Sequence, residues 1–211
     1  LDYGVLQAVS DFNLERGEAD FDEEWSIIAD YAKASGRPFS FSLMQRDFAP
    51  DQWLKLIART EKLKEAGVDA RMQVAPRAIG VFLGFNCTFH PFMGYPSYKT
   101  IADLPLAERV KRMKDPAFKA KILGEKTEKL AGPGSSVPPL ADMLMEHIDY
   151  VAEKFFQLGN PPDYEQAAES SLAAKARAKG VSLMEMIYDT LLERDGHELI
   201  YLPLYNYTEL N

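Results

Sequence analysis

The sequence has very little cysteine, no long apolar run and none of the common catalytic signatures, and each shortage excludes a class of protein. Its single cysteine, Cys87, excludes an internal disulfide framework and leaves the redox compartment unmarked. No apolar stretch approaches the roughly 18 residues that a membrane span needs. Glycine-rich phosphate loops and G-x-S-x-G elbows are also absent. The usual signatures of nucleotide binding and serine hydrolysis are therefore missing.

The chain also lacks an excess of positive charge, since its 24 lysines and arginines are outnumbered by 32 acidic residues. The 211 residues carry a net charge of -8, whereas binding to nucleic acid or to an anionic membrane surface needs a positive footprint. The 46% hydrophobic and 27% charged residues are ordinary for a soluble domain of moderate size. We therefore expect a soluble, cytoplasmic protein with no nucleic-acid or membrane partner.

A strand–helix–strand pattern organises the first part of the chain. The predicted strands are Pro38–Met44 and Arg71–Ala75, and the helix between them begins at Pro50 and ends at Gly67. An earlier strand, Gly4–Val9, and a helix over Asp22–Ser35 precede this unit. Strands separated by single helices predict adjacent parallel pairing with the helices on one side, so the fold class is α/β.

The rest of the chain is more irregular. We expect residues 1–81 to form a βαβαβ unit, residues 82–166 an aromatic loop and a helical insertion, and residues 167–211 helices with a returning strand, Glu198–Tyr205. The loop Phe82–Tyr98 is long enough to be a lid or a binding surface. The six lysines from Lys111 to Lys129 indicate either an anion site or a solvated helical face, and the charge pattern favours the solvated face.

Candidate binding residues follow the predicted strands. In parallel α/β folds the functional face lies at the carboxyl ends of the strands, where this sequence places Ser10, Asp11, Gln45, Arg77 and Asn206. A guanidinium at Arg77 could hold a substrate carboxylate bidentately, and a salt bridge to a neighbouring acid is the alternative.

The three histidines do not form a metal-binding pair in the sequence. His147 and His197 are interpreted as surface or capping side chains, and Cys87 as a small packing residue. His90 lies in the aromatic loop and is the histidine for which we predict a role at a substrate pocket.

Seven blocks along the chain together resemble one group of enzymes. The sequence is similar to the amidohydrolases that include the N-acyl-D-amino-acid deacylases, such as D-aminoacylases and N-acyl-D-glutamate deacylases. The similarity covers essentially the whole chain, and its specificity comes from the number and order of the blocks. They are G-V-L-Q-A-V-S-D-F, R-P-F-S-F-S-L-M-Q, Q-V-A-P-R-A-I-G, H-P-F-x-x-Y-P-S-Y, L-P-L-A-E-R-V, L-G-N-P-P-D-Y-E and Y-L-P-L-Y-N-Y.

The resemblance implies a metal-dependent TIM-type fold, of which this chain would be a partial (β/α)8 barrel with a mainly helical insertion. The group's first-strand His-x-His and last-strand catalytic Asp are absent from these residues. Its later histidines would fall near Ser10-Asp11 and Met44-Gln45, where this sequence has none. The resemblance thus implies a divalent metal, zinc, in a longer parent protein, and we expect no metal ligand in this chain.

Two functions follow from these observations. The first is a fragment of an amidohydrolase in which a metal-activated water attacks the amide of an N-acyl-D-amino acid or a related compound, the chain alone being inactive. The second is a half-barrel module that binds a small molecule without chemistry. The chain begins and ends in strand-like runs, so we also expect a fragment that associates with itself through exposed strand edges.

Overall fold

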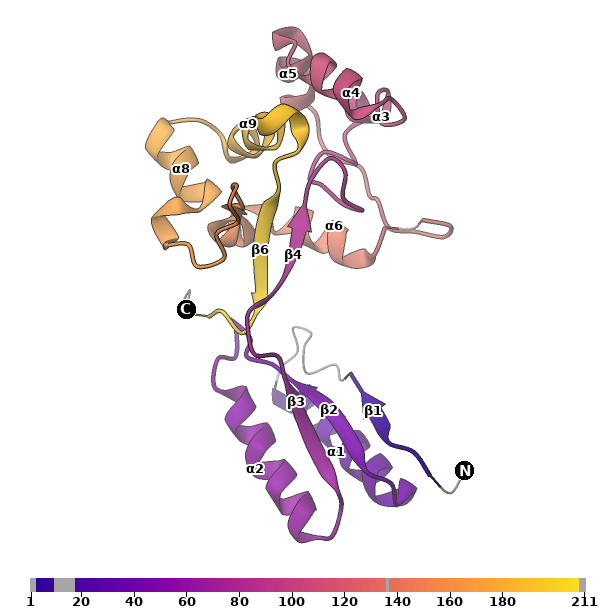
Figure 1. The fold of residues 1–211 in the computed structure, drawn as a ribbon. Coiled ribbons are helices and arrows are strands. Elements are labelled where there is room, and N and C mark those ends of the chain that lie inside the picture. Colours follow the sequence, from indigo (N-terminus) through magenta and orange to yellow (C-terminus); the bar gives the residue numbers. More distant parts are fainter. Residues whose placement is uncertain (1–2, 10–17, 136, 209–211) are drawn as a thin grey trace. The chain divides into compact units, whose positions relative to one another are not determined.

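The chain folds into two compact units (Figure 1). The computed structural model describes residues 3–9, 18–135 and 137–208. Unit 1 contains the described residues of Leu1–Ile79 and Leu204–Glu209, and unit 2 contains Gly80–Pro203. The predicted insertion over 82–166 and the helices that follow it therefore lie in the same unit.

Unit 1 is a parallel three-stranded sheet with two helices. The strands β1 (Leu6–Ala8), β2 (Phe39–Leu43) and β3 (Ala70–Val74) pair in the order β1-β2-β3, and both pairings are parallel. The helices α1 (Glu18–Ser35) and α2 (Gln52–Glu65) connect them. The prediction of three adjacent parallel strands is confirmed.

The core of unit 1 forms on one face of β2. Side chains alternate across a strand, so Phe39, Phe41 and Leu43 point to the same face, and all three are buried. Helices α1 and α2 both pack against that face, which confirms the prediction that the helices lie on one side. The buried residues that the helices contribute to this cluster are Phe21, Ile28, Ala32 and Leu56.

The opposite face of this sheet is polar. The Gln7 amide Nε2 donates to Gln73 Oε1 at 3.0 Å, and the Gln73 Nε2 donates to the Ser40 hydroxyl at 3.4 Å. These bonds cross all three strands on the face that the helices leave uncovered. The sheet therefore has one apolar and one polar face.

Unit 2 contains a second small sheet. Its strands β4 (Ile79–Leu83), β6 (Ile200–Tyr205) and β5 (Phe156–Gln157) pair in the order β4-β6-β5, and β5 runs antiparallel to β6. Figure 1 shows β4 beside β6. Strand β4 approaches β6 closely: a Cβ on Gly80 would lie 2.5 Å from the Tyr201 ring. Glycine is required there because no side chain fits between the two strands.

This second sheet contradicts the predicted partial (β/α)8 barrel. A barrel fragment would add each new strand in parallel to one continuous sheet. Instead, β6 pairs with β4 and β5, so the described strands form two small sheets and no closed barrel. The prediction failed because it placed an irregular loop from Phe82 onward, where β4 in fact extends to Leu83 and finds a partner more than 100 residues away in the sequence.

Short helices surround the second sheet. The predicted helix start at Ser182 is confirmed, since its hydroxyl accepts from the Glu185 backbone N–H at 3.1 Å. None of the helices in the described ranges is both long and apolar enough to cross a membrane. The α-helices of unit 2 are α3 (Pro96–Lys99), α4 (Leu106–Met113), α5 (Pro116–Leu123), α6 (Pro139–Glu146), α7 (Ile148–Val151), α8 (Leu172–Lys179) and α9 (Leu183–Gly196).

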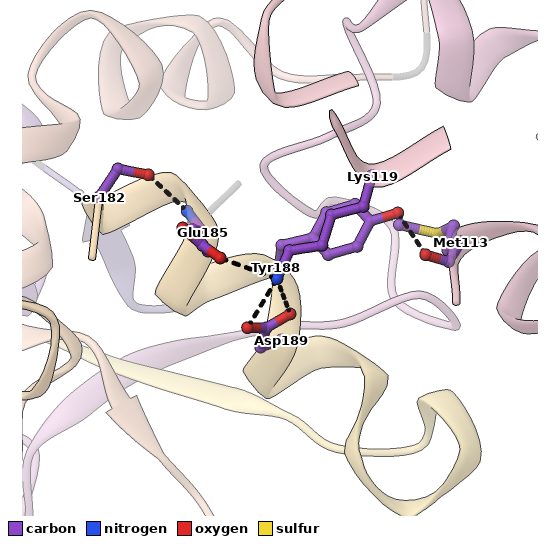
Figure 2. A network of polar contacts seen from close by, with 6 residues as sticks. All are labelled: Met113, Lys119, Ser182, Glu185, Tyr188 and Asp189. Atoms are coloured by element: carbon purple, nitrogen blue, oxygen red, sulfur yellow. Dashed lines mark hydrogen bonds and ion pairs between the residues drawn. The ribbon is translucent and has the colours of Figure 1, made fainter. Parts of the chain in front are cut away.

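A polar network ties α4 and α5 to α9 (Figure 2). The Lys119 ammonium lies 3.0 Å from a Glu185 carboxylate oxygen and 2.8 Å from one of Asp189. Burial opposes the charge of Lys119, but hydrogen bonds to Asp189 and Glu185 outweigh it and raise the lysine pKa. The Tyr188 hydroxyl donates to the Met113 carbonyl oxygen at 2.8 Å. The end of α4 is thereby fixed against α9.

Candidate functional site

Asn206 joins the carboxyl ends of β2 and β3 in unit 1. Its side-chain oxygen accepts from the Gln45 backbone N–H at 2.8 Å. Its backbone N–H donates to the Gln45 carbonyl oxygen at 3.0 Å. Its side-chain nitrogen lies 3.5 Å from the Ala75 carbonyl oxygen, just beyond β3. Asn206 has φ of 59°, a left-handed conformation that asparagine tolerates better than most residues. Two of the predicted site residues, Gln45 and Asn206, are thus brought together.

Arg46, which sequence reasoning missed, is buried at the same edge. Only 3% of its surface is exposed, and its guanidinium lies 4.4 Å from the centre of the Phe48 ring and donates to the Gln52 side chain. Burial lowers the pKa of Arg46 from its usual value, and an electrostatic interaction with Tyr205 opposes that shift. The sequence shows only an arginine directly after Gln45, and nothing in that pattern indicates that its side chain is buried.

Arg77 lies two residues beyond Ala75, on the segment that follows β3. Its side chain is exposed and forms no ion pair or side-chain hydrogen bond with any residue in the described ranges. The alternative of a salt bridge to a neighbouring acid therefore finds no support among those residues. Among the residues that the structure describes, none occupies the five N–H donors of the Arg77 guanidinium.

Asp11 and Ser10 fall outside the described residues. Their predicted place after the first strand therefore stays a prediction, and the predicted site residues that the structure describes in unit 1 are Gln45, Arg77 and Asn206.

His90 belongs to unit 2 and is part of its core. Its side chain is 2% exposed, and its Nδ1 accepts from the Phe92 N–H at 3.2 Å. The ring contacts Phe85 and Tyr98 at centroid distances of 5.0 and 4.5 Å. Burial, followed by the nearby charge of Arg109, lowers the pKa of His90 to about 3. A neutral imidazole whose Nδ1 is already bonded holds the aromatic loop in shape.

Arg109 completes this aromatic cluster. Its Nη1 donates to the Tyr98 hydroxyl at 2.6 Å and to the Phe85 carbonyl at 3.0 Å, and its Nη2 lies 3.5 Å from the Asn86 side-chain oxygen. Charge-assisted bonds of this kind fix the loop between β4 and α3.

The metal that the sequence resemblance implies does not fit the described residues. No group of three or more histidine, cysteine, aspartate or glutamate side chains in these ranges is arranged to hold a metal ion. The positions near Gln45 offer an amide and, at Met44, a thioether, which are not the donor set that zinc requires. The chemistry available at the edge of unit 1 is the recognition of a carboxylate or an amide by guanidinium and amide groups.

Replacement of Asn206 tests whether it holds this edge together. Asn206→Ala should lower the free energy of unfolding of unit 1 by about 2–3 kcal/mol, because it loses a hydrogen bond and leaves alanine in a left-handed conformation. Asn206→Gly should recover about 1 kcal/mol of that loss because glycine adopts positive φ without strain. Urea unfolding followed by tryptophan fluorescence reports on unit 1, since both tryptophans, Trp25 and Trp53, lie there. Equal losses in the two variants would contradict the backbone argument.

The buried neutral His90 predicts an acid-sensitive stability. The unfolded chain takes up a proton at this residue below about pH 6.5, whereas the folded chain does so only near pH 3. The stabilisation is therefore complete above pH 6.5 and is lost as the pH falls toward 3, at up to about 1.4 kcal/mol per pH unit. His90→Asn keeps an acceptor for the Phe92 N–H and should remove this slope in urea unfolding followed by circular dichroism. The exposed His147→Asn is the control, and an unchanged slope in His90→Asn would refute the assignment.

Comparison of the chain with protein-family models, with curated proteins and with solved structures finds no match. The similarity to N-acyl-D-amino-acid deacylases is thus carried by the sequence blocks alone and stays a prediction.

Proposed function

We propose that this chain is the substrate-recognition part of an amidohydrolase that acts on N-acyl-D-amino acids or related compounds. The observation that carries the proposal is the exposed Arg77, which lies beside strand ends that Asn206 holds together. The succession of deacylase-like blocks along the sequence supports the same reaction class.

The proposed substrate combines a carboxylate with an amide, and the edge of unit 1 suits both groups. A guanidinium binds a carboxylate through two parallel hydrogen bonds, which a planar, permanently charged arginine can form at the end of β3. The chain as a whole carries a net charge of -8, which repels an anion at long range. Recognition of an anionic substrate therefore depends on local cations, and Arg77 is an exposed cation at this edge among the described residues.

The hydrolytic step is assigned by this proposal to residues outside the 211-residue chain, which alone would be inactive. A divalent metal, zinc in the proposed enzyme, would be held by those other residues, because the described ones do not fit it. The proposed partner is a small-molecule substrate, and the proposed compartment is the cytoplasm.

We further propose that the isolated chain associates with itself through strand edges. Among the described strands, β1 and β3 each have one neighbour only, and Val74 on β3 is 63% exposed. Light scattering across a concentration series should show a mass that rises with concentration. Val74→Lys should suppress the rise, whereas Leu54→Lys, at an exposed leucine of α2, should not. A monomer at every concentration would overturn this proposal.

Replacement of Arg77 tests the proposed recognition. Arg77→Met should weaken the binding of N-acetyl-D-methionine to the 211-residue chain by about 10- to 100-fold in isothermal titration, since a bidentate charged pair is lost. Arg112→Met removes an exposed arginine of unit 2 and should leave the Kd unchanged. In the longest natural protein that contains this sequence, Arg77→Met should raise KM by a similar factor with little change in kcat.

The outcomes separate the two functions considered. Hydrolysis of acyl-amino acids by that longer protein supports the deacylase proposal. Binding without hydrolysis, in a protein that contains no metal, would replace it with a binding module. Unchanged binding in Arg77→Met would refute the role of Arg77 in either case.

A further inference from the structure

Unit 2 carries a groove of about 670 Å³ that none of the preceding functions uses. It is lined by residues of α4, by Asn86, by Asp195 from the non-helical end of α9, and by His197 directly after α9. Its volume lies within the roughly 300–1,000 Å³ that is usual for small-molecule sites. The lining combines an apolar strip with charged and polar groups at its border.

The apolar strip comes from one face of α4. Val110 lies four positions after Leu106 and three after Ala107, so it neighbours both on the helix surface, and all three line the groove. Lys111 borders this strip and is exposed. It forms no ion pair with any residue that the structure describes, so its ammonium is available to an anion.

The wall opposite α4 is the end of α9, where the backbone leaves the helical conformation. Arg194 and Asp195 adopt φ of 52° and 54°, and Gly196 follows with φ of 82°. Residues other than glycine in this conformation cost on the order of 1–3 kcal/mol each and persist where the surrounding structure holds them. A Cβ on Gly196 would lie 2.4 Å from Val110 Cγ2, so the turn is pressed against α4 at a point where only glycine fits.

The two lysines that line the groove differ in whether they have a carboxylate partner. Asp195 Oδ1 lies 3.0 Å from the Lys114 ammonium, so Lys114 already has a carboxylate partner. Lys111 lies one helical turn earlier and has no carboxylate partner among the described residues. The positive charge that can meet a ligand is therefore placed at the end of the apolar strip.

The walls of the groove are fixed before any ligand binds. The Tyr188–Met113 hydrogen bond and the contacts of Lys119 with Glu185 and Asp189 hold α4 and α5 against α9 (Figure 2). Preformed walls lower the entropic cost of binding.

We propose that this groove binds a small amphiphilic carboxylate of the medium-chain fatty-acid class. Its alkyl chain lies on Leu106, Ala107 and Val110, and its carboxylate meets Lys111. This assignment changes the interpretation of the lysine-rich stretch, for which the sequence favoured a solvated face. It does not depend on Arg77, which lies in the other unit.

Titration of the 211-residue chain with hexanoate, followed by ¹H–¹⁵N NMR, tests the proposal residue by residue. Amide shifts should concentrate on α4 and on residues 195–197. Lys111→Gln should weaken hexanoate binding by about five- to tenfold, because a charge-assisted hydrogen bond to an exposed cation is lost. Arg112→Gln is the matched control: it removes the same charge from the next residue of α4, which does not line the groove, and should change the Kd by less than twofold.

Two further variants make the result decisive. Ala107→Glu places a carboxylate on the apolar strip and should abolish the shifts, and Arg77→Met should leave them unchanged. Hexylammonium has the same chain with the opposite charge and should not bind. The proposal is overturned by the absence of localised shifts at 10 mM hexanoate, by equal effects of Lys111→Gln and Arg112→Gln, or by equal binding of hexylammonium.

Discussion

The apolar face of β2 must be covered, and the architecture of unit 1 depends on that requirement. Phe39, Phe41 and Leu43 together expose almost nothing to solvent, because α1 and α2 both pack on their side of the sheet. Burial of an aromatic or leucine side chain is worth about 1.5–3 kcal/mol, so this face dominates the stability of so small a sheet. A single central strand thus decides where both helices lie and which face of the sheet stays polar.

The same requirement explains how much of unit 1 could be predicted from the sequence. Alternation along β2 and the apolar spacing of the two helices are local signals, and the parallel order of β1, β2 and β3 follows from single-helix connections. The pairing of β6 with β4 and β5 has no such local signal. It joins Phe156 with Tyr201, and it places Gly80 of β4 against Tyr201 of β6, so it is decided by contacts between residues far apart in the sequence. The predicted barrel extended the local parallel pattern into a region where these long-range pairings prevail.

Some residues of the candidate site could likewise be predicted from the sequence, and others could not. The rule that strands present functional groups at their carboxyl ends led to Gln45 and Asn206, which the fold does bring together through a reciprocal pair of hydrogen bonds. It did not lead to Arg46, because a sequence does not reveal that a cation directly after a strand is buried and rests on Phe48. For His90, the aromatic neighbours that suggested a pocket instead indicate a packed core, where burial keeps the imidazole neutral.

Both proposed sites rest on one electrostatic argument about where cations lack a partner. Some lysines and arginines of this acidic chain already have a carboxylate partner, as Lys119 has in Glu185 and Asp189, and Lys114 has in Asp195. An exposed cation without such a partner among the described residues keeps its full attraction for an anion and has no competing ion pair to break. Arg77 meets this condition beside a polar strand edge, and Lys111 meets it beside an apolar strip. The difference in surroundings predicts different ligands: Arg77 suits a carboxylate that also carries an amide, and Lys111 suits a carboxylate that carries an alkyl chain.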